Sequence, residues 1–78
     1  MNAMPLDDAL RAGLIDVARR LADSRGWPWI EPITVTAVAH RGEAAWEVRS
    51  NALALGRNVR VVLRRSDSTV LEAGYLPR

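Results

Sequence analysis

Residues whose side chains could carry catalytic chemistry are few and scattered in this chain. His40 is the only histidine, and there is no cysteine. A general base needs a nucleophile or an orienting carboxylate at a recognisable spacing, and the serines and acids around His40 form no such motif. One histidine with dispersed carboxylates also lacks the ligand cluster of a metal site. We therefore expect no catalytic residues, no metal and no cofactor, with His40 a solvated residue of a hairpin.

The segment Trp27-Pro28-Trp29 has the composition of a protein-binding site. Tryptophan buries a large area with few rotatable bonds and is enriched at interaction hot spots, and the intervening proline fixes the directions of the two indoles. The alternative is structural, because a chain without phenylalanine needs large side chains to close its core. Trp27 and Trp29 are therefore candidate partner-binding residues, or one or both of them pack over the end of a helix.

Arginine supplies all eleven basic residues, and six of them lie in the C-terminal thirty residues, which contain only two acids. Arg49, Arg60 and Arg64 fall on one face of the predicted sheet and are candidate partner-binding residues. Guanidinium groups bind acidic protein surfaces or nucleic-acid phosphates. Sheet-based RNA readers stack bases on aromatic side chains, which this face lacks, so the protein partner is favoured. The structural alternative is cross-strand pairing with Glu47 and Glu72.

One amphipathic helix is expected in the N-terminal third. Leucine and valine recur at spacings of three and four residues, which predicts a helix over about 5–25 with one apolar stripe. Pro5 suits its first position, and Gly26 suits the left-handed conformation that follows a last turn. Gly13 lies on the apolar side, where we expect the helix to approach the sheet closely. The stripe comprises Leu6, Leu10, Leu14, Val17 and Leu21.

Apolar and polar residues alternate through the second half of the chain, which predicts an antiparallel sheet with one buried face. The expected strands cover about 33–41, 44–50, 58–65 and 69–75. The predicted fold class is α+β, with one N-terminal helix packed on a four-stranded antiparallel β-meander. The length of 78 residues fits a single domain over 1–78.

Turn residues set the expected strand pairing. Gly42-Glu43 suits a two-residue type II′ turn, which places Ala39 opposite Trp46 and, in the same register, Ala37 opposite Val48. In the last hairpin, pairing keeps the apolar residues on one face. The expected pairs there are Leu63 with Leu71 and Val61 with Ala73.

The link over 51–56 is too short for a packed helix and too apolar for a fully solvated loop. We expect Leu53 or Leu55 to close one end of the core.

Three segments together resemble the core of small PepSY-like proteins, including a group of bacterial toxin-immunity proteins: 46–50, 56–61 and 67–74. In that family a helix precedes a tryptophan-bearing strand, a glycine-containing link, a valine-rich strand, and an aspartate-containing turn into a last strand. This chain has Ser68 where the family usually has glycine after the turn. The resemblance implies a cystatin-like helix-on-sheet fold and non-enzymatic binding to, or inhibition of, another protein.

These observations favour a small non-catalytic protein-interaction module, with an immunity or inhibitor role as one form of it. The alternative is a small basic nucleic-acid-binding protein that uses the arginine-rich sheet face. No apolar run approaches the roughly 18 residues of a membrane span, and acids stand near the N-terminus, so we expect a cytoplasmic protein without a membrane partner. A homodimer is a further expectation, because an open sheet has free edges.

Overall fold

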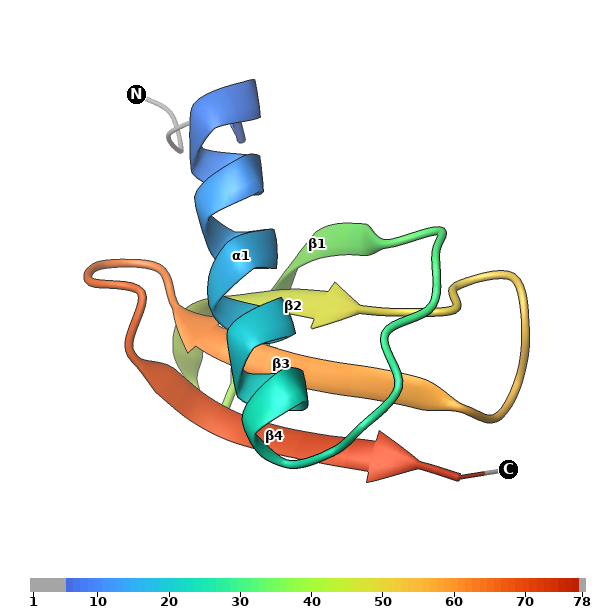
Figure 1. Ribbon diagram of the computed structural model, residues 1–78. Helices are drawn as coiled ribbons and strands as arrows, with labels where there is room; N and C mark the ends of the chain where they lie inside the picture. Colours follow the sequence, from blue (N-terminus) through green and yellow to red (C-terminus); the bar gives the residue numbers. More distant parts are fainter. Residues whose placement is uncertain (1–5, 78) are drawn as a thin grey trace.

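One helix packs against a single antiparallel sheet in the computed structural model, which describes residues 6–77 (Figure 1). The helix α1 (Asp8–Ser24) is followed by four strands: β1 (Thr34–His40), β2 (Glu43–Arg49), β3 (Asn58–Arg64) and β4 (Val70–Leu76). The strands pair in chain order, each antiparallel to the next. The predicted α+β fold, a helix on a four-stranded meander, is confirmed.

Caps define both ends of α1. Asp7 is the N-cap, and its side chain accepts a hydrogen bond of 2.7 Å from a main-chain N–H of the first turn. The helix therefore begins later than predicted, and Pro5 lies outside the described residues. At the other end Gly26 has a φ of 71°, and the N–H of Trp27 donates to the carbonyl of Ala22 at 2.9 Å. This is a Schellman motif, as Gly26 indicated.

The buried face of α1 is narrower than the predicted stripe. Leu14, Ala18 and Ala22 are buried, whereas Val17 is 37% exposed. The smaller Ala18 and Ala22 thus occupy the side of the helix that faces the sheet, and Val17 lies toward solvent. The close approach expected at Gly13 is wrong, because a Cβ built there would meet nothing within 4 Å. Across the described residues 6–77, no helix is both long and apolar enough to cross a membrane.

The first hairpin is shifted by two residues from the predicted pairing. Trp46 pairs with Ala37, not with Ala39. The turn residues are Arg41 and Gly42, with φ values of 53° and 81°, which is the geometry of a type I′ turn rather than the predicted II′ turn. A shift of two keeps each side chain on its predicted face. The face toward α1 therefore supplies the buried core residues, which are Trp46, Val48, Val59, Val61 and Leu63.

A bulge interrupts the last hairpin. Val61 pairs with Ala73 as predicted, but Leu63 pairs with Val70. The predicted pairing of Leu63 with Leu71 is wrong, because the register shifts beside Leu63 and leaves Leu71 without a partner opposite it. The alternation of faces in β4 holds only on the C-terminal side of this bulge.

Candidate protein-binding surface

Two of the candidate arginines on the outer sheet face, which points away from α1, are held in ion pairs. Arg60 pairs with Glu47 and lies 3.1 Å from Glu72, while Arg64 donates a hydrogen bond of 2.7 Å to Glu43. The hydrogen bond to Glu47 raises the pKa of Arg60, and that to Glu43 raises the pKa of Arg64. The carboxylates thus occupy the donors that a phosphate would need.

Ion pairing removes the positive surplus of the outer face. The three candidate arginines there, Arg49, Arg60 and Arg64, are accompanied by four carboxylates, those of Glu43, Glu47, Asp67 and Glu72. This arrangement matches the cross-strand pairing that the sequence left as an alternative. Arg49 differs from the other two, because it has no ion-pair partner within residues 6–77. Two of the three guanidiniums on which the nucleic-acid alternative relied are thus engaged by carboxylates.

His40 is not the solvated residue that the sequence suggested. Its side chain is only 15% exposed, and its Nε2 lies 3.4 Å from an oxygen of Glu72. Since β1 and β4 are the two edges of the sheet, this contact shows that the sheet curls around its outer face, where Ala45 and Val62 are fully buried.

No group of three or more His, Asp or Glu side chains in the described chain is arranged to hold a metal.

Both candidate tryptophans pack against the core. Trp27 and Trp29 are partly buried beside the helix end, and the ring of Trp27 stacks on Tyr75 with centroids 6.1 Å apart. The guanidinium of Arg25 lies over the same indole, 5.3 Å from the centroid of the Trp27 ring. The structural alternative for these residues therefore describes their surroundings well, and each keeps a partly exposed edge.

The loop between β2 and β3 carries the most exposed large apolar residues described. Leu53 is 88% exposed and Leu55 is 91% exposed. The expectation that one of them closes the core is wrong. In Figure 1 this yellow-to-orange loop extends beyond the sheet, at the end where β4 also finishes. Two leucine side chains are thus exposed to water, which is unfavourable by the free energy that burying them would release.

Asn58 fixes the backbone of the loop that carries Leu53 and Leu55 through hydrogen bonds of its side-chain amide. Its side chain is buried at the start of β3. Nδ2 donates to the carbonyls of Ser50 and Asn51, each at 2.9 Å, and of Ala54 at 3.2 Å. Oδ1 accepts from the N–H of Gly56 at 2.7 Å. Because an amide group has only two hydrogens for these three carbonyls, the longest bond shares one of them.

A second set of hydrogen bonds ties the loop to the connector between α1 and β1. The N–H of Asn51 donates to Ile30 at 2.6 Å, and the N–H of Ala52 donates to Pro32 at 3.0 Å. The Asn51 side chain also donates to the carbonyl of Gly56 at 3.0 Å. Asn51 and Gly56 have φ values of 50° and 107°, a region that Asn and Gly adopt at low cost. The loop is therefore fixed at its base and from one side.

Two arginines and a third leucine lie at the same end of the sheet as the loop. Arg57 is exposed, and within residues 6–77 neither it nor Arg49 has an ion-pair partner. Leu76, at the end of β4, is 48% exposed. A hollow of about 290 Å³ is lined by Arg49 and Leu76 among others. We call the surface formed by Leu53, Leu55, Leu76, Arg49 and Arg57 the leucine end.

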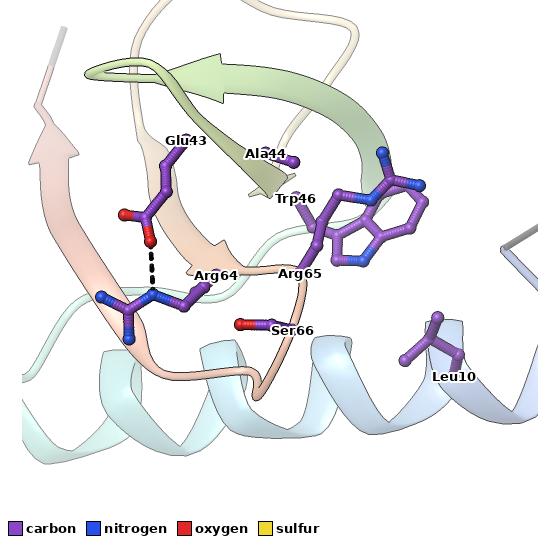
Figure 2. A pocket seen from close by; sticks show the side chains of 7 residues that line it. All are labelled: Leu10, Glu43, Ala44, Trp46, Arg64, Arg65 and Ser66. Carbon is purple, nitrogen blue, oxygen red and sulfur yellow. Dashed lines mark hydrogen bonds and ion pairs between the residues drawn. The ribbon is translucent and has the colours of Figure 1, made fainter. Parts of the chain in front are cut away.

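A pocket of about 420 Å³ lies at the opposite end of the sheet, beside the turn between β3 and β4 (Figure 2). Leu10 of α1 faces it, and the guanidinium of Arg65 lies 4.5 Å above the ring of Trp46. Trp46 remains buried beneath this cation–π contact. The pocket therefore exposes little of the indole, and Arg65 acts as a cover for the core at this end.

Comparison of the chain with protein-family models, with curated proteins and with solved structures gives no match. The resemblance to PepSY-like proteins stays a prediction, and the geometry of the leucine end is what supports the function proposed below.

Proposed function

We propose that this protein is a non-catalytic protein-binding module, which inserts Leu53 and Leu55 into an apolar pocket of another protein. The observation that carries the proposal is the exposure of these two leucines, 88% and 91%, on a loop that is fixed by hydrogen bonds. Large apolar side chains at a protruding position contribute favourable free energy only when a partner removes them from water.

Order in the loop strengthens the proposal. A flexible loop loses conformational entropy when it binds, and this loss reduces affinity. The bonds of Asn58 and Asn51 already restrict the backbone between the two strands. The loop is thus organised for binding in its free state, in the manner of a preformed contact segment.

Charge around the leucines indicates the chemistry of the partner. Arg57 lines a hollow with Leu55, Arg49 lies at the end of β2 that leads into the loop, and neither is neutralised by a carboxylate in the described residues. An apolar pocket with an acidic rim would satisfy both the leucines and the guanidiniums. The role of an immunity or inhibitor protein, which the PepSY-like resemblance implies, is one form of such binding.

The tryptophans have a supporting part in this proposal. Trp27 and Trp29 begin the connector whose later carbonyls, at Ile30 and Pro32, hold the loop. Arg60 and Arg64 remain in their ion pairs and supply no contact. Of the five candidate residues predicted from sequence, Arg49 alone lies in the proposed contact surface.

Paired substitutions test the proposal. Leu53→Ser with Leu55→Ser should lower the affinity for a captured partner at least about thirtyfold, the effect of losing a hot spot of about 2 kcal/mol. Both side chains are exposed, so the folded state should persist by circular dichroism. The immobilised full chain would capture partners from a lysate of the producing cells, and titration calorimetry would then measure each dissociation constant.

The matched control replaces exposed valines elsewhere, Val17→Ser and Val70→Ser, which are 37% and 40% exposed. Its affinity for the captured protein should equal that of the unsubstituted chain. Equal affinity of the leucine variant would contradict the proposal. Salt-sensitive retention of nucleic acid, unaffected by the leucine substitutions, would instead revive the alternative function.

A further inference from the structure

Strand β1 is an edge of the sheet without the usual protection against pairing. Its seven residues pair with β2 in one unbroken register. From Thr34 to Ala39 it contains no charged residue and no proline. Thr34, Thr36, Ala37 and Ala39 are exposed. Natural proteins protect such edges with charges, prolines, bulges or covering segments, because the free backbone groups otherwise attract another strand.

The turn determines which backbone groups of β1 are free. In a two-residue hairpin the residues that flank the turn, here His40 and Glu43, bond to each other. Bonding then alternates along the strand, so His40, Val38 and Thr36 face β2. The N–H and C=O groups of Val35, Ala37 and Ala39 therefore point away from the sheet. This gives β1 a regular row of free donors and acceptors.

The opposite edge differs. Strand β4 contains the bulge beside Leu71 and the charged Glu72, and Val70 lies at its irregular end. A bulge twists the edge and breaks the even spacing of donors that a new strand would need. Helix α1 does not close the edge at β1 either. It packs over β2 and β3, and its Arg11 donates a hydrogen bond of 2.9 Å to the carbonyl of Ile33, the residue before β1.

We propose that a second copy of this chain pairs with β1, antiparallel and centred on Ala37, to form a continuous eight-stranded sheet across a two-fold axis. In this register Val35 lies opposite Ala39, and Thr36 lies opposite Val38, of the second copy. All seven positions of the strand then pair, and no like charges meet. The apolar side chains on the helix side of β1 become neighbours across the axis.

This arrangement is independent of the proposed partner-binding function. Antiparallel pairing sends the two leucine ends in opposite directions, so each stays accessible. The dimer would present two binding loops on one particle. Self-pairing needs no residue of the leucine end.

Mass measurement tests the pairing. Sedimentation equilibrium of the full chain at concentrations up to about 1 mM should give twice the monomer mass of 8.6 kDa. Ala37→Pro removes an N–H that faces away from β2, toward the second copy. It should raise the dissociation constant of the dimer at least about tenfold and leave the far-ultraviolet circular dichroism spectrum unchanged. Val70→Lys, on the other edge, should leave the dimer intact.

Cross-linking provides a second readout that does not depend on the folding of the proline variant. The chain has no cysteine, so Ala37→Cys introduces the only thiol. Opposed residues in an antiparallel pair have Cα atoms about 4.5–5.5 Å apart, within the range that a disulfide spans. Mild oxidation should link most Ala37→Cys chains and few Val70→Cys chains. A monomer at all concentrations, or equal linking of both variants, would overturn the proposal.

Discussion

Replacing Asn58 with alanine is expected to lower the free energy of unfolding by about 2–4 kcal/mol, because the change leaves buried backbone groups without partners. The amide of Asn58 serves the N–H of Gly56 and the carbonyls of Ser50, Asn51 and Ala54. Alanine can neither accept nor donate these bonds. A chain of this length has a stability of about 4–12 kcal/mol, so the loss is a large fraction of the total. Urea unfolding followed by circular dichroism would measure it.

Two controls separate this effect from simple truncation. Ser50→Ala removes one buried acceptor, that of the N–H of Val59 at 2.8 Å, and should cost about 1–2 kcal/mol. Ser66→Ala, at an exposed position of another turn, should change stability by less than about 0.5 kcal/mol. An Asn58→Ala chain as stable as the Ser66→Ala chain would show that Asn58 does not organise the loop.

Trp46→Ala is expected to cost about 3–5 kcal/mol, the range for deleting a large buried aromatic side chain. Trp46 is the one buried tryptophan, and it packs in the core cluster with Leu14, Val48 and Leu63. The neighbouring side chains of Ala18 and Ala22 are too small to fill the cavity that removing the indole would leave. The loss is a large fraction of the whole stability, so the urea midpoint should fall strongly, as titration followed by circular dichroism would show.

Conservative changes should be much milder at the same place. Trp46→Phe keeps most of the buried volume and should cost less than half as much as Trp46→Ala. Arg65→Ala removes only the guanidinium 4.5 Å above the ring and should cost about 0.5–1 kcal/mol. If Trp46→Ala unfolded at the same urea concentration as Arg65→Ala, the core would not depend on the indole as described.

Alternation of apolar and polar residues was sufficient to predict the fold. Side chains in a strand alternate between faces, so Trp46, Val48 and Val61 could be assigned to one side before their partners were known. The finer pairing was not predictable in this way. Arg41 takes a positive φ that few residues with a Cβ adopt, so the turn lies one residue closer to the N-terminus than predicted and the pairing is shifted by two.

The helix and the loop depended on packing that a periodicity does not contain. Hydropathy favoured Val17 for the buried stripe, but the side of the helix that packs on the sheet carries the smaller Ala18 and Ala22. Apolar character likewise suggested that Leu53 or Leu55 was buried. The available signal was the pair of asparagines that flank the loop, Asn51 and Asn58, whose amides can bond to the backbone of a tight turn.

Candidate residues on the outer face were predicted as a set, but the structure divides them. The sequence correctly placed Arg49, Arg60 and Arg64 on one face, because side chains alternate between faces along β2 and β3 and these three fall opposite the apolar residues. It could not show that Arg60 and Arg64 reach carboxylates while Arg49 does not, because rotamers and the curl of the sheet decide these distances. Ion pairing therefore separates Arg60 and Arg64 from Arg49, the one of the three that belongs to the proposed contact surface.

Binding through Leu53 and Leu55 requires that the loop between β2 and β3 holds them in solvent as an ordered segment. Backbone ¹⁵N relaxation of the full chain measures this directly. Order parameters over 52–57 should lie near about 0.85, the value of rigid backbone. Values below about 0.6 across these residues, with the strands rigid, would contradict the account, because the leucines would then belong to a flexible segment with no preformed contact surface.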